Sequence, residues 1–334
     1  MTDNGSTKEF TTADIREIGF GFQKSRIFLT AYELEIFTAL GGKSKSSDEV
    51  SKELGTDSRA LDRLMNALCA MSLLKKKNGK FSNTPSGSRF LVKGRPEYMQ
   101  GLMHFSDLWN SWSALTKAVR FGRPAAFQSI NKRDEDSLTG FIAAMHERGY
   151  RQAPLIISML DLSNVKSVLD IGGGSGIFSI AFVKAKDGIK ATVFDLPNVV
   201  PITRMYADKE KCSDKIITIP GNYLSDALPK GFDLIFLSAV IHSNSPKENN
   251  LLIKKCYRSL NPEGQIVIQD FIMDDDRTSP SFGAFFALNM LVGTEKGDTY
   301  TGSDVKGWIK NAGFSKISRS NTDFNTSLII GKKK

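Results

Sequence analysis

The stretch VLDIGGGSGIF, residues 168–178, decides the fold of this chain. An apolar run ends at Asp170, glycines follow at alternate positions, and apolar residues resume at Ile177. This order predicts a buried strand, a tight turn and a helix with a buried face. Because glycine has no Cβ, a ligand can approach such a turn closely, and the N-terminus of the helix offers free N–H groups. We therefore predict a nucleotide-type binding loop at Gly172, Gly174 and Gly176.

Short apolar runs alternate with segments of helical periodicity from Val165 onward. This alternation is typical of an α/β fold in which helices cover a parallel sheet. We expect about seven strands, at Ser167–Asp170, Ala191–Phe194, Ile216–Ile219, Leu234–Ser238 and Gln265–Asp270, near Ile317, and at Ser327–Ile330.

The residues that close these runs are candidate site residues, because ligands of open α/β sheets bind outside the carboxyl ends of the strands. Acidic, amide and imidazole groups stand at these positions. They are Asp170 with the glycines, Asp195, Gly221 with Asn222, Ser238 to His242, and Asp270. We expect them to line one edge of the sheet.

The charges around the glycines indicate which ligand the loop binds. Asp195 lies about 20 residues further on, where a carboxylate can accept hydrogen bonds from both hydroxyls of a ribose, as in NAD sites. Ile177 stands where the dinucleotide fingerprint requires its last glycine. Asp170, just before the glycines, would attract the cationic methionine part of S-adenosylmethionine and repel a pyrophosphate. The observations on Ile177 and Asp170 favour S-adenosylmethionine over NAD. No Gly-Lys-Ser or Gly-Lys-Thr follows the loop, which excludes a P-loop.

Three helical segments fill the first third of the chain. Periodic apolar residues run from residue 12 to 40, and Ser46 or Ser47 then caps a short helix. The third helix begins at Ser58, and Asn78-Gly79 after it is a strong hairpin signal. Three helices and a hairpin are the order of a winged helix. The only charges of the third helix are Arg59, Asp62 and Arg63, so it suits packing better than contact with DNA phosphates.

The middle of the chain, residues 98–160, predicts further helices rich in Phe, Trp and Met. We expect most of these aromatic side chains in the core, and their number also suits a dimer interface or a lid over an organic substrate. Residues 120–136 mix glycine, proline and charge, which is typical of a loop.

Length and composition indicate a soluble protein of two domains. The chain has 334 residues, of which 40% are hydrophobic and 24% charged. No apolar stretch approaches the roughly 18 residues of a membrane span, and the polar first ten residues lack the core of a signal peptide. Cys69, Cys212 and Cys256 lie far apart, which indicates reduced thiols and no metal framework. We therefore expect a cytoplasmic protein.

The net charge of +9 is spread along the chain, with dense clusters only at residues 75–77 and 332–334. We therefore expect no nucleic-acid partner and no membrane. From the residues alone, two other classes of protein stay open. One is a cofactor-binding regulatory protein whose winged helix contacts DNA, and the other is an NAD-dependent reductase.

Five longer motifs point to a known family. They are LDIGGGSG (169–176), FDLP (194–197), FDLIFLSAVIH (232–242), LNPEGQIVIQDF (260–271), and FFALNMLVGTEKGDTYT with NAGF (285–314). Through them, residues 12–332 resemble the S-adenosylmethionine-dependent small-molecule O-methyltransferases of the caffeate, acetylserotonin and hydroxyneurosporene type.

The resemblance implies a Rossmann-like, seven-stranded class I methyltransferase domain at residues 161–332. It also implies an N-terminal winged-helix dimerisation domain at residues 12–96, joined by linker and substrate-pocket helices at residues 97–160. The protein would be a homodimer that methylates a hydroxyl of a small aromatic or polyketide-like metabolite in secondary metabolism. Its cofactor would be S-adenosyl-L-methionine, S-adenosyl-L-homocysteine would be the product, and no metal would take part.

Position by position, the resemblance also implies a cofactor site. The three loop glycines would pass the methionine and ribose parts, with Asp170 beside them. Asp195 would hold the ribose hydroxyls, and Leu196 would pack on the adenine. Asn222, between Gly221 and Tyr223, would accept a hydrogen bond from the adenine amine through its carbonyl oxygen. Ser238 would lie beside the carboxypropyl group.

His242 matches the catalytic base of the family, and Asp270 matches the acidic residue that orients this base. A base is needed because a neutral hydroxyl is a poor nucleophile, and an imidazole, with an ordinary pKa of about 6.5, can take its proton at neutral pH. The chain departs from the family at Ser243, where Asp usually follows the base, and at Thr299, where a second charged helper is usual. These changes leave transfer to nitrogen, sulfur or carbon open, as well as a weakened homologue.

The acceptor pocket would combine the helices before the glycine loop with the segment Pro280–Val292. Methionine and aromatic side chains suit a flat apolar acceptor. The candidate residues are Phe141, Met145, Phe286, Asn289 and Met290.

Overall fold

The computed structural model describes residues 9–127 and 130–334. The chain forms two compact units, Met1–Ser106 and Asp107–Lys334. The division falls inside one helix, α7 (Leu102–Ser113). Most of the polar N-terminal segment, residues 1–8, and two residues of the expected 120–136 loop lie outside the described residues.

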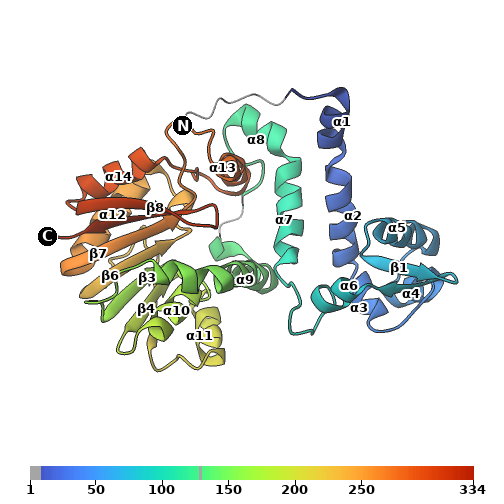
Figure 1. Cartoon of the computed structure of the whole chain (residues 1–334), viewed down its shortest axis with the longest axis horizontal. Helices are drawn as coiled ribbons and strands as arrows, with labels where there is room; N and C mark the ends of the chain where they lie inside the picture. The colour runs from blue at the N-terminus through green and yellow to red at the C-terminus, as the bar shows by residue number, and fades with distance from the viewer. Residues whose placement is uncertain (1–8, 128–129) are drawn as a thin grey trace. The chain divides into compact units, whose positions relative to one another are not determined.

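The first unit holds short helices and one hairpin (Figure 1). The expected helices and hairpin are present, but the periodic segment 12–40 is divided. Glu35 adopts a left-handed φ of 54° and interrupts the helix there. The elements are α1 (Thr12–Phe20), α2 (Phe22–Glu33), α3 (Ile36–Leu40), α4 (Ser47–Leu54), α5 (Ser58–Ala70), β1 (Leu74–Lys77), β2 (Lys80–Asn83) and α6 (Pro85–Phe90).

Local signals in the sequence set the ends of these elements. Ser46 caps α4 in a capping box with Glu49, as one of the two expected caps. In the hairpin turn Asn78 and Gly79 both have positive φ, 48° and 76°, which a type I′ turn requires. Helix α5 buries Leu61, Met65 and Leu68 in the core of the unit. The third predicted helix therefore packs into the core of the unit, as its few charges indicated.

The second unit is a seven-stranded sheet with helices on both faces. Its helices and turns are α8 (Leu115–Phe121), η1 (Ile130–Lys132), α9 (Glu135–Ser158), α10 (Ile177–Ala185), α11 (Val200–Lys209), η2 (Ile241–Ser243), α12 (Pro246–Ser259), α13 (Ser281–Gly293) and α14 (Gly302–Asn311). Its strands are β3 (Ser167–Ile171), β4 (Lys190–Asp195), β5 (Ile216–Pro220), β6 (Phe232–Ser238), β7 (Leu260–Asp270), β8 (Ser315–Asn321) and β9 (Ser327–Lys332).

The strand order is β5-β4-β3-β6-β7-β9-β8. All seven predicted strands are present, but the expectation of a parallel sheet holds only for β3 to β7. Strand β9 lies antiparallel between β7 and β8. The short connection from β8 to β9 explains the difference, since only antiparallel neighbours can be joined without a crossover.

Two cores lie on the two faces of the sheet. Along β6, Ile235 and Leu237 face the core formed with α12 and α14, while Leu234 and Phe236 face the core formed with α9 and α10. This alternation follows from the two-residue period of a strand. Figure 1 shows α12 and α14 on one side of the sheet and α9, α10 and α11 on the other. In the described part of the chain, no helix has the length and apolarity to cross a membrane. The cytoplasmic location stays a prediction.

Substitution of Phe236 tests how much the core on the α10 side of the sheet contributes to the stability of the second unit. Its ring is fully buried, 4.9 Å from the ring of Phe178 and 5.4 Å from that of Phe182. Phe236→Ala should lower the free energy of unfolding by about 3–5 kcal/mol, because it removes a buried ring and leaves a cavity. Urea titration followed by tryptophan fluorescence measures this unit alone, since all three tryptophans belong to it.

Leu251→Ala is the control, because Leu251 is exposed on α12. It should change the free energy of unfolding by no more than about 0.5 kcal/mol. Equal effects of the two substitutions would contradict the layer arrangement.

Candidate functional site

The glycine loop connects β3 to α10, as the sequence predicted. Gly172, Gly174 and Gly176 have φ angles of 66°, 58° and 74°, which other residues rarely adopt. A Cβ on Gly173 would lie 2.7 Å from Oδ2 of Asp170, so this position also needs glycine. The loop therefore presents bare backbone at the carboxyl end of β3.

Asp195, at the end of β4, fixes the glycine loop. Its Oδ2 accepts a hydrogen bond from the Gly174 amide at 2.8 Å, and its Oδ1 accepts one from the Leu196 amide at 2.7 Å. Burial raises the pKa of Asp195, while these two amides lower it. A carboxylate has about four acceptor positions, so each oxygen keeps the capacity to accept a further hydroxyl.

Asp170 lies beneath the loop and is almost completely buried. Its Oδ2 accepts a hydrogen bond from Oγ of Ser179 at 2.8 Å, whereas no hydrogen-bond partner of Oδ1 is found among the described residues. Burial raises the pKa of Asp170 to about 7, the Ser179 bonds oppose the rise, and the charge of Asp195 adds to it. An uncompensated buried oxygen next to a ligand loop suits a cationic ligand.

Four further predicted residues lie at the ends of β5 and β6. The side-chain oxygen Oδ1 of Asn222 accepts a hydrogen bond from the Leu224 amide at 2.9 Å and keeps one lone pair for a further donor. The hydroxyl of Tyr223 donates to Oδ1 of Asn244 at 3.1 Å, and burial raises the pKa of this tyrosine to about 12. Ser238 donates to Oε1 of Gln269 at 2.6 Å. Gly221 is required because a Cβ there would overlap the ring of Phe194.

His242 and Asp270 form a buried pair at the ends of β6 and β7. Nδ1 of His242 lies 2.7 Å from Oδ1 of Asp270, and the His242 amide donates to Oδ2 at 3.4 Å. The Phe271 amide also donates to Oδ1, at 2.8 Å. Only 9% of His242 and 2% of Asp270 are exposed. Because a carboxylate only accepts hydrogen bonds, this contact assigns the proton of a neutral imidazole to Nδ1 and leaves Nε2 as an acceptor.

A buried amide network supports the turn after His242, where the chain departs from the family. Nδ2 of Asn244 donates to Oδ1 of Asn249 at 3.0 Å, and Nδ2 of Asn249 donates to the Ile241 carbonyl at 2.9 Å. The hydroxyl of Tyr300 donates to the carbonyl oxygen of Asn244. This network was not predicted, although one signal was present. Asn249 shares a helix face with Leu252, Ile253 and Cys256, which indicates a buried amide.

The segment around Thr299 packs on the backbone of His242. The Asp298 amide donates to the His242 carbonyl at 2.9 Å, and a Cβ on Gly297 would overlap that same carbonyl. Thr299 itself is buried. The segment thus positions the turn that carries the histidine.

Aromatic rings gather beside the imidazole. The ring of Phe286, on α13, stands edge-on to His242 with the centroids 5.0 Å apart. It also packs on Phe271 at 4.2 Å, and Phe271 packs on Phe282 at 5.0 Å. Above Phe271 lies the guanidinium of Arg148, with its carbon 4.5 Å from the ring centroid. Of these, only Phe286 was predicted.

The other predicted acceptor residues lie in different surroundings. Asn289 accepts a hydrogen bond from Nε1 of Trp112 at 2.9 Å, and Met290 is buried on the same helix, α13. Phe141 and Leu196 both pack against the buried cluster of Leu138, Ile142 and Val199, and the centre of the Phe141 ring lies 4.9 Å from the guanidinium carbon of Arg133. Met145 lies partly buried on α9. The structure thus brings Phe286 to the imidazole, and it places Phe141 against the same cluster as Leu196.

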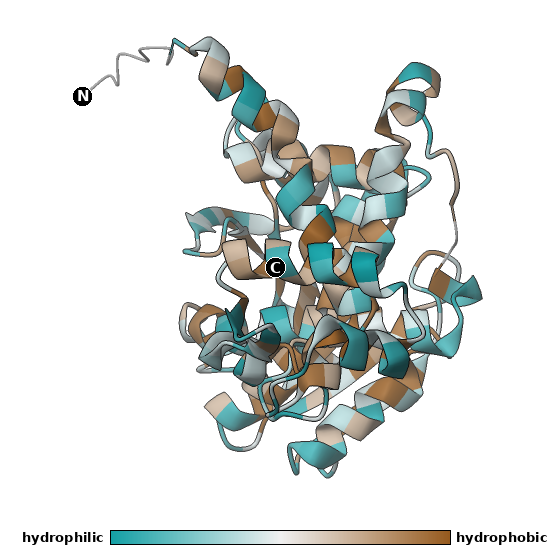
Figure 2. Cartoon of the chain, turned by 90° about the vertical axis from the view of Figure 1, so that its right-hand side faces the viewer, coloured by the Kyte–Doolittle hydropathy of each residue, from teal (hydrophilic) through white to brown (hydrophobic). Residues whose placement is uncertain are grey.

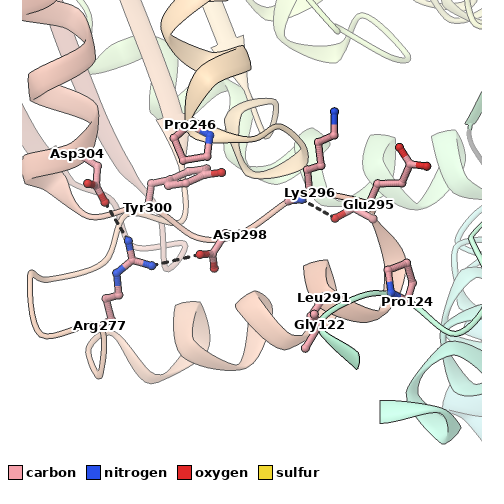
Figure 3. A pocket seen from close by; sticks show the side chains of 12 residues that line it. Gly122, Pro124, Pro246, Arg277, Leu291, Glu295, Lys296, Asp298, Tyr300 and Asp304 are labelled. Carbon is pink, nitrogen blue, oxygen red and sulfur yellow. Dashed lines mark hydrogen bonds and ion pairs between the residues drawn. The ribbon is translucent and has the colours of Figure 1, made fainter. Parts of the chain in front are cut away.

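A cavity of about 280 Å³ is lined in part by residues 294–298, the segment whose Asp298 amide donates to the His242 carbonyl (Figure 3). In its wall, Arg277 pairs with Asp298 and Asp304, at 3.2 Å each. None of the predicted site residues lines this cavity, so we do not assign it to the acceptor. In the described part of the chain, no group of three or more His, Cys, Asp or Glu side chains is arranged to hold a metal ion.

Comparisons with known proteins identify the family. The profile of the O-methyltransferase domain matches residues 112–315, and that of the O-methyltransferase dimerisation domain matches residues 17–93. The chain therefore belongs to the O-methyltransferase family and is an S-adenosylmethionine-dependent O-methyltransferase. The family and fold class inferred from the motifs are confirmed.

Named relatives match almost the full chain. The tetracenomycin polyketide synthesis 8-O-methyl transferase TcmO of Streptomyces glaucescens is 27% identical over 327 residues, 96% of each chain. The 3-hydroxy-5-methyl-1-naphthoate 3-O-methyltransferase of Streptomyces sahachiroi is 27% identical, over 91% of this chain and 89% of its own. Human N-acetylserotonin methyltransferase in complex with SAM has a similar structure, with a TM-score of 0.81 at 24% identity over 98% of this chain and 99% of that chain.

Asp170 gives a prediction for the pH dependence of stability. Its folded pKa of about 7 lies above the ordinary value of 3.8, so the folded state keeps a proton that the unfolded state has lost. The contribution of this carboxyl group to stability is therefore full below about pH 4 and is lost as the pH rises through about 7. Asp170→Asn cannot titrate, so the melting temperature of the variant minus that of the wild type should increase from about pH 5 to about pH 8. A difference that stays constant over this range would contradict the shift.

Proposed function

We propose that this enzyme transfers a methyl group from S-adenosylmethionine to a hydroxyl of a small aromatic or polyketide-like metabolite, with His242 as the general base. The observation that carries the proposal is the contact of 2.7 Å between Nδ1 of His242 and Oδ1 of Asp270. It leaves Nε2 free to accept the hydroxyl proton. A positioned base of this kind typically contributes about 10²–10⁴-fold to a reaction rate.

Asp270 would orient the imidazole and stabilise its charged form after it has taken the proton. It is held by its own contacts, since Oδ1 also accepts the Phe271 amide and Oδ2 accepts the His242 amide. The network around Asn244 would keep the turn in place although Ser243 replaces the usual acidic residue. Oxygen as the receiving atom is supported by the family profile and by the relatives, which are named as O-methyltransferases.

The residues at the sheet edge fit the cofactor. The glycine loop would pass the methionine and ribose parts, Asp195 would accept from the ribose hydroxyls, and Asp170 would compensate the cationic sulfur. Bound there, S-adenosylmethionine supplies an electrophilic methyl group. The remaining cofactor contacts that we propose are those of Leu196, Gly221, Asn222, Tyr223 and Ser238.

The aromatic rings near His242 support a flat acceptor. Phe286 stands edge-on to the imidazole and packs at a tilt on the buried ring of Phe271, and Phe286 itself is only partly buried beside the base. We propose that Phe141, Met145, Asn289 and Met290 complete the pocket. TcmO and the naphthoate methyltransferase are named for aromatic polyketide chemistry, which agrees with this class of acceptor.

We also propose that the first unit forms a homodimer. Helix α1 has no buried residue, and Ile15, Ile18 and Phe20 are each at least 60% exposed. Figure 2 shows apolar residues along the helical stretch that follows the grey N-terminal trace. Large exposed apolar side chains on one helix are typical of an interface.

His242→Gln tests the proposed base. Turnover should fall by about 10²-fold or more, because the hydroxyl loses its proton acceptor, while the affinity for S-adenosylhomocysteine should not change. Turnover is measured with labelled S-adenosylmethionine and a panel of phenols and naphthols, and affinity by isothermal titration calorimetry.

The control is Ser243→Ala, at an exposed side chain directly beside the histidine. It should retain wild-type turnover. If His242→Gln also retained it, His242 would be structural and the acceptor would ionise unaided. A loss of cofactor affinity in His242→Gln would likewise contradict the assignment.

A further inference from the structure

Arg148 lies on α9 at the edge of the proposed acceptor site. It continues the helix face of Phe141 and Met145, since the three positions are four and three residues apart. Its guanidinium carbon stands 4.5 Å above the ring of Phe271, the residue directly after Asp270. The other neighbours of this ring are Phe282, Phe286 and His242, the last at 6.0 Å. Arg148 and the imidazole therefore contact the same aromatic ring.

The guanidinium of Arg148 has no polar partner in the structure. Among residues 9–127 and 130–334 it makes no hydrogen bond and no ion pair, although it is partly buried. Arg319 is partly buried too, but it donates to Ser327 and the Ile272 carbonyl and pairs with Asp274 at 3.7 Å. An arginine without such partners has lost hydration that nothing in the chain replaces.

Asp270 does not satisfy this charge. It attracts Arg148 electrostatically, but its oxygens accept hydrogen bonds from His242 and from the Phe271 amide. Burial is the larger influence and lowers the pKa of Arg148, yet arginine remains charged at any ordinary pH. A fixed positive charge thus stands beside an apolar ring, and Asp270, which attracts it, is already engaged in other hydrogen bonds.

The contact with Phe271 leaves the hydrogen-bond donors of Arg148 available. A cation over an aromatic ring is attracted by its charge, whereas the five N–H groups in the plane of the guanidinium still need acceptors. The planar fork of these N–H groups matches the two oxygens of a carboxylate. A cation at this position would not increase the affinity for a purely apolar acceptor. A methionine or leucine side chain would fill the same space, and no charged group would lose its hydration.

We propose that Arg148 binds a carboxylate of the methyl acceptor, so that the enzyme selects an aromatic acid that carries both a hydroxyl and a carboxylate. The inference rests on the proposed function, because it places the acceptor ring against Phe286, which packs on the buried ring of Phe271. The hydroxyl then faces Nε2 of His242 and the carboxylate faces Arg148. Arg148 acts as a specificity residue and takes no part in the proton transfer.

Binding measurements test this assignment without turnover. The enzyme is saturated with S-adenosylhomocysteine and titrated with 1-hydroxy-2-naphthoate, 3-hydroxy-2-naphthoate, 6-hydroxy-2-naphthoate and the matching primary carboxamides. Wild type should bind at least one acid about 10-fold or more tightly than its amide. Arg148→Gln should bind the acid and the amide equally, and Arg148→Lys should keep part of the preference, because lysine keeps the charge without the planar fork. Arg151→Gln, which removes an exposed arginine from the same helix, should behave as wild type.

Three results would overturn the inference. The first is a wild-type enzyme that binds none of the acids more tightly than its amide. The second is an Arg148→Gln variant in which the affinities for the acid and for the amide both fall by the same factor, so that the preference for the acid remains. That result would make Arg148 a packing residue. The third is weaker binding of S-adenosylhomocysteine to that variant, which would indicate that the guanidinium binds the carboxylate of the cofactor. If wild type binds the acids more tightly than the amides but transfers no methyl group, the proposed function is refuted. The assignment of Arg148 to a carboxylate of the bound ligand would still hold.

Discussion

The parallel alignment of β3 to β7 is the constraint on which the site depends. It places five carboxyl ends at one edge of the sheet. Asp195 and Asp270 are the last residues of their strands, and the glycine loop, Asn222 and His242 come shortly after such an end. Ser238 pairs with Gln269 in β6 and β7, which fixes the register there. Asp270 directly follows Gln269 and His242 comes soon after Ser238, so their side chains are close enough for a contact of 2.7 Å. Residues 28 apart in sequence meet because the sheet aligns them.

Three buried carboxylates at this edge are distinguished by their partners. Asp195 is held by two backbone amides, and Asp270 is held by the imidazole and an amide. Asp170 accepts from Ser179 alone at Oδ2, and burial raises its pKa to about 7. In the proposed function, one residue type would serve for hydroxyl recognition, for orientation of a base and for charge compensation, because the number of donors around each carboxylate differs.

Local patterns in the sequence predicted most of the fold. The glycine loop, the hairpin at Asn78-Gly79 and the cap at Ser46 follow from the conformations that these residues favour, and the strands follow from short apolar runs. The direction of β9 could not be predicted in this way, because an apolar run looks the same in either orientation. The motifs shared with the family include His242 and Asp270, and this marked both residues as candidates for the site.

Contacts between distant segments could not be predicted. The network at Asn244 joins Tyr223, Asn249 and Tyr300, and no periodicity links these positions. Arg148 continues the predicted face of α9, but its place above Phe271 depends on how α9 packs against the end of β7. Side-chain partners of this kind are set by tertiary packing, which a single sequence does not display.

The tautomer of His242 tests the proposed chemistry most directly. The chain has only three histidines, His104, His146 and His242, so ¹⁵N-histidine labelling with His242→Gln as the assignment control resolves the signal of each. In the neutral form of the ring, we expect the proton on Nδ1 and an unprotonated Nε2, because Asp270 accepts from Nδ1. A ring that carries its proton on Nε2 would have no acceptor for the hydroxyl proton, and this result would contradict the role of His242 as the base.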